Sequence, residues 1–210
     1  GEGTLSASFI PVYSELLEEG REEEAGRTAG AIFGLLFALA GTLTLLGILL
    51  APVLVGVFLP GFEGERRALT VEVVRIIFPM TGVIVLSVWA LGILNSHRQF
   101  FVSYVAPVAW NVAIIATMVF FGAQLTQDRL VVAIAWGALV GGVLQFAVQL
   151  PFVLRLQKWL KPSLDIRRPP VREAVRNAGP AILGRGVVQL SSYVDYLLPS
   201  FLAAGAVAMI

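Results

Sequence analysis

The 210-residue sequence contains no cysteine, one histidine and few charged residues. The absence of cysteine excludes disulfide bonds and thiolate metal sites. Charged residues make up 14% of the chain, which is about half the share of a typical soluble domain, whereas apolar residues make up 57%. The net charge of +1 favours neither nucleic acid nor an acidic substrate as a partner. This composition is typical of a protein whose solvent is the lipid bilayer.

The sequence also lacks the motifs of common enzymes. It has no phosphate-binding glycine loop followed by Lys and Ser or Thr, no His-Glu-x-x-His, and no serine with a histidine and an acid on nearby spans. Asp195 is the one acid that we place deep in an apolar run. We therefore expect no enzymatic activity and no cofactor, a sodium ion excepted.

Long apolar runs predict membrane-spanning helices, because crossing a bilayer takes about 20 apolar residues. Four complete runs occupy residues 29–59, 68–94, 101–121 and 130–154. A truncated amphipathic segment at 5–17 precedes them, and an apolar run at 178–210 follows. The prediction is an all-α polytopic membrane protein. Since the chain starts without Met and without a signal peptide, we expect a fragment of a longer protein.

A basic stretch at residues 155–177 separates the fourth run from the last. It holds seven of the fifteen Lys and Arg residues, and short loops rich in these residues stay in the cytoplasm. Alternating spans then place ten basic residues inside and three outside. Within this linker, an apolar stripe predicts a short helix lying on the lipid headgroups, formed by Leu156, Trp159, Leu160 and Leu164.

Small and polar residues in the spans indicate how the helices pack. Gly26, Gly30 and Gly34 recur every four residues, which lets another helix approach closely; a sliding interface for conformational change is the alternative. For Asn111 and Gln145 we expect hydrogen bonds between helices, or contact with a wet cavity. Prolines in the spans predict bent or broken helices, at Pro52, Pro79, Pro107 and Pro199.

Several motifs occur together in one order and spacing over essentially the whole chain. They are GEG at 1–3, FIPV at 9–12, GILN at 92–95, AP at 106–107 with Asn111, GGVLQ at 141–145, QLP at 149–151, GPAILG at 179–184, SFLA at 200–203 and Gly205. On these motifs the sequence resembles the bacterial lipid II flippase MurJ (MviN) family, within the multidrug/oligosaccharidyl-lipid/polysaccharide exporter superfamily.

The resemblance implies a multi-pass protein of the bacterial cytoplasmic membrane that transports lipid II by alternating access, for peptidoglycan synthesis, cell wall biogenesis and cell shape. It implies 14 helices in two lobes around a cationic cavity. This chain then holds part of helix 2 and helices 3 to 6 of the N-terminal lobe (1–154), the linker (155–177) and helix 7 of the C-terminal lobe (178–210). The implied partners are lipid II or a similar polyprenyl-pyrophosphate lipid, membrane lipids and the missing helices. The alternatives are a related polysaccharide-lipid or drug exporter, and a non-transporting scaffold with the same fold.

The resemblance also bears on individual residues. It places Glu2 beside the cavity, because Glu2 and Gly3 match the helix 2 motif. It gives Arg185 no substrate role, since an uncharged residue is expected there; Arg185 lies about 10 Å into its run, within snorkelling reach of the interface. In some members an acid on helix 7 contributes to a sodium site, which makes Asp195 the candidate ligand.

A physical reason supports a cation at Asp195. Pro199 removes the N–H that would pair with the carbonyl of residue 195, so a free carbonyl and a carboxylate arise from one residue. Hard cations prefer oxygen ligands, and unwound carbonyls hold Na⁺ in transporters. The alternatives are a protonated Asp195 hydrogen-bonded to a neighbour and a pairing with an arginine on an absent helix.

Overall fold

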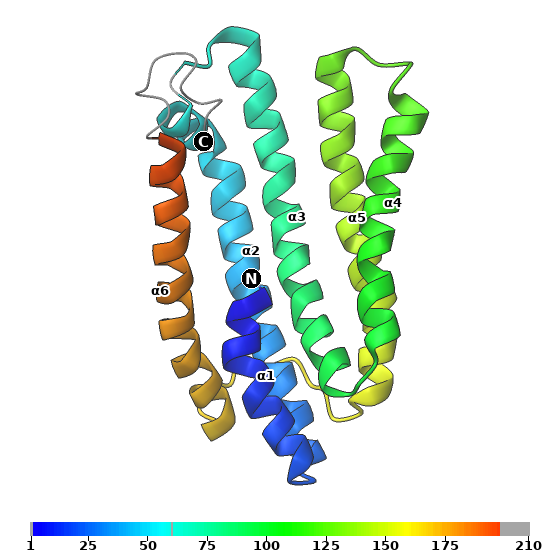
Figure 1. Cartoon of the computed structure of the whole chain (residues 1–210), viewed down its shortest axis with the longest axis vertical. Helices are drawn as coiled ribbons and strands as arrows, with labels where there is room; N and C mark the ends of the chain where they lie inside the picture. The colour runs from blue at the N-terminus through cyan, green and yellow to red at the C-terminus, as the bar shows by residue number, and fades with distance from the viewer. Residues whose placement is uncertain (1, 60, 198–210) are drawn as a thin grey trace.

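The chain folds into a bundle of α-helices (Figure 1). The computed structural model describes the backbone of residues 2–59 and 61–197, and the side chains of residues 3–59 and 61–184. The helices in that part of the chain are α1 (Glu2–Glu18), α2 (Glu22–Phe58), α3 (Gly64–Ser96), α4 (Phe100–Phe121), α5 (Gln127–Leu156) and α6 (Pro169–Leu197). The described backbone contains no strand, and the all-α prediction is confirmed.

Four of the helices, α2 to α5, are long and apolar enough to cross a membrane. They contain the four predicted runs, apart from residue 59 at the end of the first, and extend beyond most of their ends. The largest extension is at the start of α2, where Glu22, Glu23 and Glu24 occupy the first turn and interact favourably with the positive end of the helix dipole. Figure 1 shows α3 between α2 on one side and the α4–α5 pair on the other.

The turns and loops divide between the two ends of the bundle. The α1–α2 corner, the α3–α4 loop and the α5–α6 linker lie at one end, and the α2–α3 and α4–α5 connections lie at the other (Figure 1). This arrangement is the one that alternating spans require. The basic residues of the linker assign its end to the cytoplasm.

No helix ends at a proline that lies within its own span in α2, α3 or α4. Pro52, Pro79 and Pro107 lie inside α2, α3 and α4, so of the two predicted outcomes, bent or broken helices, the broken helix does not occur at these positions. Each proline still leaves the carbonyl four residues earlier without its helical partner. At Pro52 the replacement comes from another helix, because Arg75 Nε of α3 donates to the carbonyl oxygen of Ile48 at 3.3 Å.

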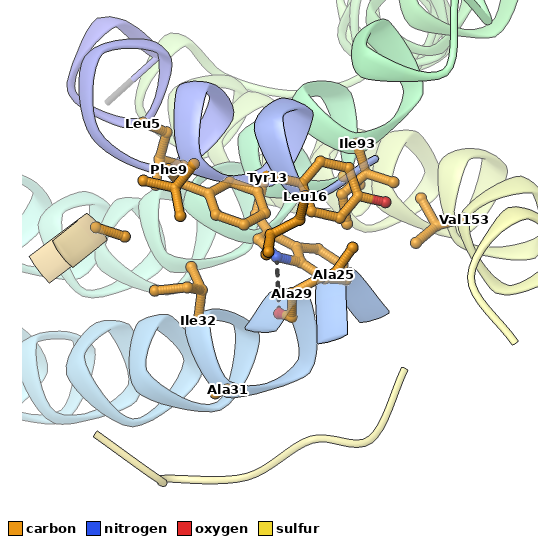
Figure 2. Packing of buried hydrophobic residues seen from close by; sticks show 14 of the residues in the cluster. Leu5, Phe9, Tyr13, Leu16, Ala25, Ala29, Ala31, Ile32, Ile93 and Val153 are labelled. Atoms are coloured by element: carbon orange, nitrogen blue, oxygen red, sulfur yellow. Dashed lines mark hydrogen bonds between the residues drawn. The ribbon is translucent and has the colours of Figure 1, made fainter. Parts of the chain in front are cut away.

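The main buried cluster lies where α1 packs against α2 and α3. Phe9 and Tyr13 of α1, and Trp89 and Ile93 of α3, are at most 1% exposed. Figure 2 shows the α1 side chains facing small residues of α2, among them Ala29, whose carbonyl accepts a 3.2 Å hydrogen bond from Trp89 Nε1. Alanines on α2 therefore make room for the aromatic rings of the neighbouring helices.

The linker between α5 and α6 runs along the glycine face of α2. Residues 157–168 contain turns and irregular chain and no helix, so the predicted short interfacial helix is wrong. A Cβ atom on Gly26, Gly30 or Gly34 would collide with residues 159, 161 and 163 respectively. The Ser163 N–H also donates to the Gly30 carbonyl at 3.3 Å. This contact holds the linker backbone in an extended path that a helix could not follow.

The glycine spacing matches the spacing of an extended chain. Four residues of an α-helix rise about 6 Å, and two residues of an extended chain span about 6.6 Å. Steps of four along α2 therefore meet steps of two along the linker. The predicted close approach at Gly26, Gly30 and Gly34 is confirmed, but its partner is extended chain and not a helix.

Helix α6 begins at Pro169, nine residues before the predicted start of the last run. The non-helical linker is therefore shorter than the predicted 155–177. Pro169 and Pro170 suit the first helical turn, where their missing N–H groups need no partner. Val171 and Ala174 are buried in the same cluster as α1, so the start of α6 packs on the helices before it.

The linker contact predicts unequal effects of alanine at two glycines of α2. Gly30→Ala would displace the linker, and we expect a loss of about 1–3 kcal/mol of stability, as for other overpacked sites. Gly41→Ala is the matched control, because its Cβ would meet nothing within 4 Å; it should be neutral, or gain up to about 1 kcal/mol from helix propensity. Thermal melting of the purified protein in detergent measures both, and equal melting temperatures would contradict the linker contact.

Candidate functional site

A hydrogen-bonded cluster joins three elements at the cytoplasmic end. Tyr13 of α1 and Gln157, which caps α5, are 0% and 3% exposed. Gln157 Nε2 donates to the Tyr13 hydroxyl oxygen at 2.6 Å, and that oxygen lies 2.9 Å from Nε2 of His97, the C-cap of α3. The Tyr13 hydroxyl can accept from both neighbours or donate its own proton to His97, so the direction of the Tyr13–His97 hydrogen bond depends on the His97 tautomer. A neutral imidazole with its proton on Nδ1 lets Nε2 accept the hydroxyl proton.

The surroundings of His97 favour this neutral form. Burial lowers the pKa of His97 below its ordinary value, and the nearby Glu22 carboxylate opposes that shift less strongly. Both nitrogens of a protonated imidazole are donors, so a protonated His97 could not accept the Tyr13 proton. The contact between α1 and the α3–α4 loop therefore depends on the charge of His97.

A second polar cluster lies between α3 and α5 within the membrane. Ser87 Oγ donates to Gln149 Oε1 at 2.6 Å, and Gln145 Nε2 donates to Ser87 Oγ at 2.8 Å. Ser87 and Gln149 are fully buried. The predicted hydrogen bond between helices is therefore confirmed for Gln145. Gln149 Nε2 is buried with no partner among the described residues.

Asn111 behaves differently from this prediction. It is exposed, and its Nδ2 donates to the carbonyl of Pro107 in its own helix at 3.1 Å, so within the described residues it links no second helix. Its neighbour Trp110 makes the contact between helices instead, through Nε1 and the Ala138 carbonyl at 2.9 Å. Successive residues of a helix point about 100° apart. When Trp110 faces α5, the next residue, Asn111, therefore points away from it.

The remaining predicted site residues lie at the two ends of the chain. Glu2 is the first residue of α1, and Arg185 and Asp195 belong to α6, but the side chains of all three lie outside the described residues. Pro199 lies outside them entirely. The role of Asp195 in cation binding therefore stays a prediction. Among the described residues, no group of three or more His, Asp or Glu side chains could hold a metal ion.

Sequence reasoning missed two kinds of residue. Glu72 and Arg75 lie three residues apart inside the predicted span 68–94 and inside α3. Two charges within a predicted span were a signal for this pair. Glu72 lies only four residues into its run, so the expectation that Asp195 is the one deep acid stays a prediction. Tyr13 and Gln157 gave no such signal, because 144 residues separate them.

These features define a multi-pass α-helical membrane protein whose helices are joined by buried polar contacts. Its connectivity places the basic linker at the cytoplasmic end. A family model described as lipid II flippase MurJ matches residues 1–210, which is the whole chain. The chain belongs to the lipid II flippase MurJ family, and it is a protein of the bacterial cytoplasmic membrane.

Individual relatives agree with the family match. The lipid II flippase MurJ of Burkholderia cenocepacia is 33% identical over 100% of this chain and 41% of its own length. Proteins named probable lipid II flippase MurJ are 32% identical in Bdellovibrio bacteriovorus and 29% in Buchnera aphidicola, over all of this chain and 40% and 41% of their own lengths. The chain thus spans about two fifths of the length of these curated relatives.

The Tyr13–His97–Gln157 cluster predicts a loss of stability in acid. Because the pKa of His97 is lowered in the folded state, its contribution to stability is complete above the unfolded pKa of about 6.5 and is lost as the pH falls through the lower folded value. We expect the melting temperature to fall between about pH 7.5 and 5, and to fall less in His97→Gln, which cannot be protonated. Equal pH dependence in both proteins would contradict this role.

Proposed function

We propose that this chain is part of a protein that transports lipid II, or a similar polyprenyl-pyrophosphate lipid, across the cytoplasmic membrane. The observation that carries this proposal is the family match along all 210 residues. The names of the relatives from Burkholderia cenocepacia and Bdellovibrio bacteriovorus support it. Such transport supplies the precursor for peptidoglycan synthesis, and with it cell wall biogenesis and cell shape.

The physical task of such a protein is to carry a charged headgroup across hydrocarbon. A charge at the centre of a bilayer is costly, so the pyrophosphate needs a polar path through the protein, while the polyprenyl tail stays in lipid. In our proposal cationic residues of a central cavity bind the headgroup, and the cavity opens to one side of the membrane at a time. The driving principle is a difference in affinity between two states. No covalent bond is broken, so we propose a transporter and not an enzyme.

The packing of α2 to α5 supports alternating access by rigid-body motion. A Cβ on Gly47 of α2 would collide with Phe78 of α3, and a Cβ on Gly141 of α5 would collide with Trp110 of α4. The polar cluster around Ser87 joins α3 to α5. Helices in such close contact move together, and rocking of one packed lobe against another is the usual motion of these transporters.

Two residues carry further parts of the proposal. Glu2, in the motif at the start of α1, is proposed to lie beside the cavity. Asp195 is proposed to bind Na⁺ through its carboxylate and through the carbonyl that Pro199 leaves without a helical partner. Sodium bound in one state and released in another would then bias the direction of transport.

Replacement of the resident flippase tests the transport proposal. The full-length protein should restore growth to bacteria depleted of their own lipid II flippase. It should also restore lipid II at the outer face, measured as cleavage by an enzyme added from the periplasmic side. An exporter of another lipid or a drug would leave lipid II inaccessible, and a scaffold would restore neither growth nor accessibility. Either result would overturn the proposal.

The sodium proposal is tested in the same cells with Asp195→Asn. We expect this variant to lose the dependence of lipid II accessibility on sodium concentration while it still reaches the membrane. The amide keeps the size of the side chain and removes its charge, so a change in sodium response follows from ligand chemistry. Unchanged sodium dependence in Asp195→Asn would reject Asp195 as a ligand without affecting the transport proposal.

A further inference from the structure

Two charges of opposite sign lie on one side of α3, within its membrane-spanning length. Glu72 and Arg75 are both exposed and stand about 60° apart around the helix axis. Neither forms an ion pair with any described residue. Because charged side chains in a membrane are costly and usually functional, this face of α3 needs a partner.

The depth of the two residues can be estimated from the length of α3. Its 33 residues extend about 50 Å, against a hydrocarbon thickness of about 30 Å, which leaves about 10 Å outside the hydrocarbon at each end. Glu72 and Arg75 then lie about 2 and 6 Å below the boundary on the side of the α2–α3 loop. Both side chains lean toward the N-terminus of α3, so they reach the headgroups of the outer leaflet.

The structure holds Arg75 in place and leaves part of its guanidinium free. Arg75 Nε donates to the carbonyl of Ile48, which Pro52 leaves without its helical partner, while no described residue bonds its two terminal nitrogens. Arg75 is one of the residues that line a cavity of about 570 Å³ between α2, α3 and α5. The cavity is lined by both charged residues, by Trp136, which is 53% exposed, and by apolar side chains such as Leu139.

The two charges match the charges of one lipid class in number, sign and order. In an outer-leaflet phosphatidylethanolamine the phosphate lies nearer the hydrocarbon and the ammonium lies farther out. Arg75 is the deeper residue and suits the phosphate, since guanidinium binds phosphate oxygens through two N–H groups. Glu72 is the shallower residue and suits the ammonium. Trp136 adds an aromatic ring at the level where such rings favour the interface.

We propose that the cavity between α2, α3 and α5 is a binding site for phosphatidylethanolamine of the outer leaflet, with Arg75 holding the phosphate and Glu72 the ammonium. An anionic lipid such as phosphatidylglycerol would place its headgroup against the Glu72 carboxylate. Phosphatidylcholine has a quaternary ammonium that donates no hydrogen bond. The site therefore discriminates between headgroups and does not depend on what the protein transports.

Lipid titration of the full-length protein in detergent, followed by native mass spectrometry, tests this site. We expect phosphatidylethanolamine to bind more tightly than phosphatidylglycerol or phosphatidylcholine. Arg75→Gln should weaken phosphatidylethanolamine binding about tenfold, which is the usual effect of losing a charged hydrogen bond, and Arg75→Lys should retain part of it. Glu72→Gln should weaken phosphatidylethanolamine and strengthen phosphatidylglycerol, because the repelling carboxylate is gone.

Arg66→Gln is the matched control. Arg66 lies on the same helix near its start, where it stacks over the Phe62 ring, and it does not line the cavity. This variant should bind phosphatidylethanolamine as the wild type does. Equal loss in Arg66→Gln and Arg75→Gln, or a wild type that binds the three lipids equally, would overturn the proposal. A full-length protein that binds no lipid here would show that another helix covers the site, and would overturn it as well. Size-exclusion profiles and melting temperatures identify any variant that fails to fold. If Arg75→Gln fails to fold, Arg75→Lys takes its place, and a folded Arg75→Lys that binds phosphatidylethanolamine as tightly as the wild type would overturn the proposal.

Discussion

The rest of the structure depends on one constraint, which is that hydrocarbon offers no hydrogen bonds to the protein backbone. Helices satisfy this constraint locally, and α2, α3 and α4 continue through their prolines. The carbonyl freed by Pro52 is bonded by Arg75 of α3. The linker backbone is not helical. It lies at the cytoplasmic end of the bundle, and its Ser163 N–H donates to the Gly30 carbonyl. At Pro52 and at the linker, a neighbouring element therefore supplies a hydrogen bond to backbone that departs from the regular helical pattern.

Local patterns in the sequence predicted the membrane-spanning helices, and non-local contacts decided the rest. The four spans follow from apolar runs that each helix carries by itself, so the predicted runs coincide with α2 to α5 apart from differences at their ends. The path of the linker does not follow from its own residues. Leu160 and its neighbours have the pattern of an interfacial helix, but Leu160 packs on the main cluster and the backbone lies on Gly30 and Gly34. A glycine repeat predicts that another segment packs closely on the helix, but it does not predict whether that segment is a helix or an extended chain.

The same distinction applies to the polar residues of the site. Gln145 and Asn111 both lie in predicted spans, and the sequence predicted the same hydrogen bond to another helix for each. Gln145 points at Ser87, whereas Asn111 bonds its own helix and faces outward. The rotation of each helix decides between these outcomes, and it is set by packing over the whole length. The Tyr13–Gln157 bond was beyond sequence reasoning for a related reason, since the two residues meet only after α1 and α5 have both docked.

The contact at Pro52 also bears on Pro199, which follows the candidate sodium ligand Asp195 by four residues. A carbonyl freed by proline is an acceptor that must find a donor or a cation, and at Ile48 a guanidinium from the adjacent helix takes that place. The prediction for residue 195 differs in one respect, because there a carboxylate would accompany the carbonyl that Pro199 leaves without a helical partner. A single arginine could neutralise both oxygens, and so could Na⁺ with further oxygen ligands. Ile48 shows that an arginine partner occurs in this fold, so the charge and oxygen content of the helix facing residue 195 decide between the two.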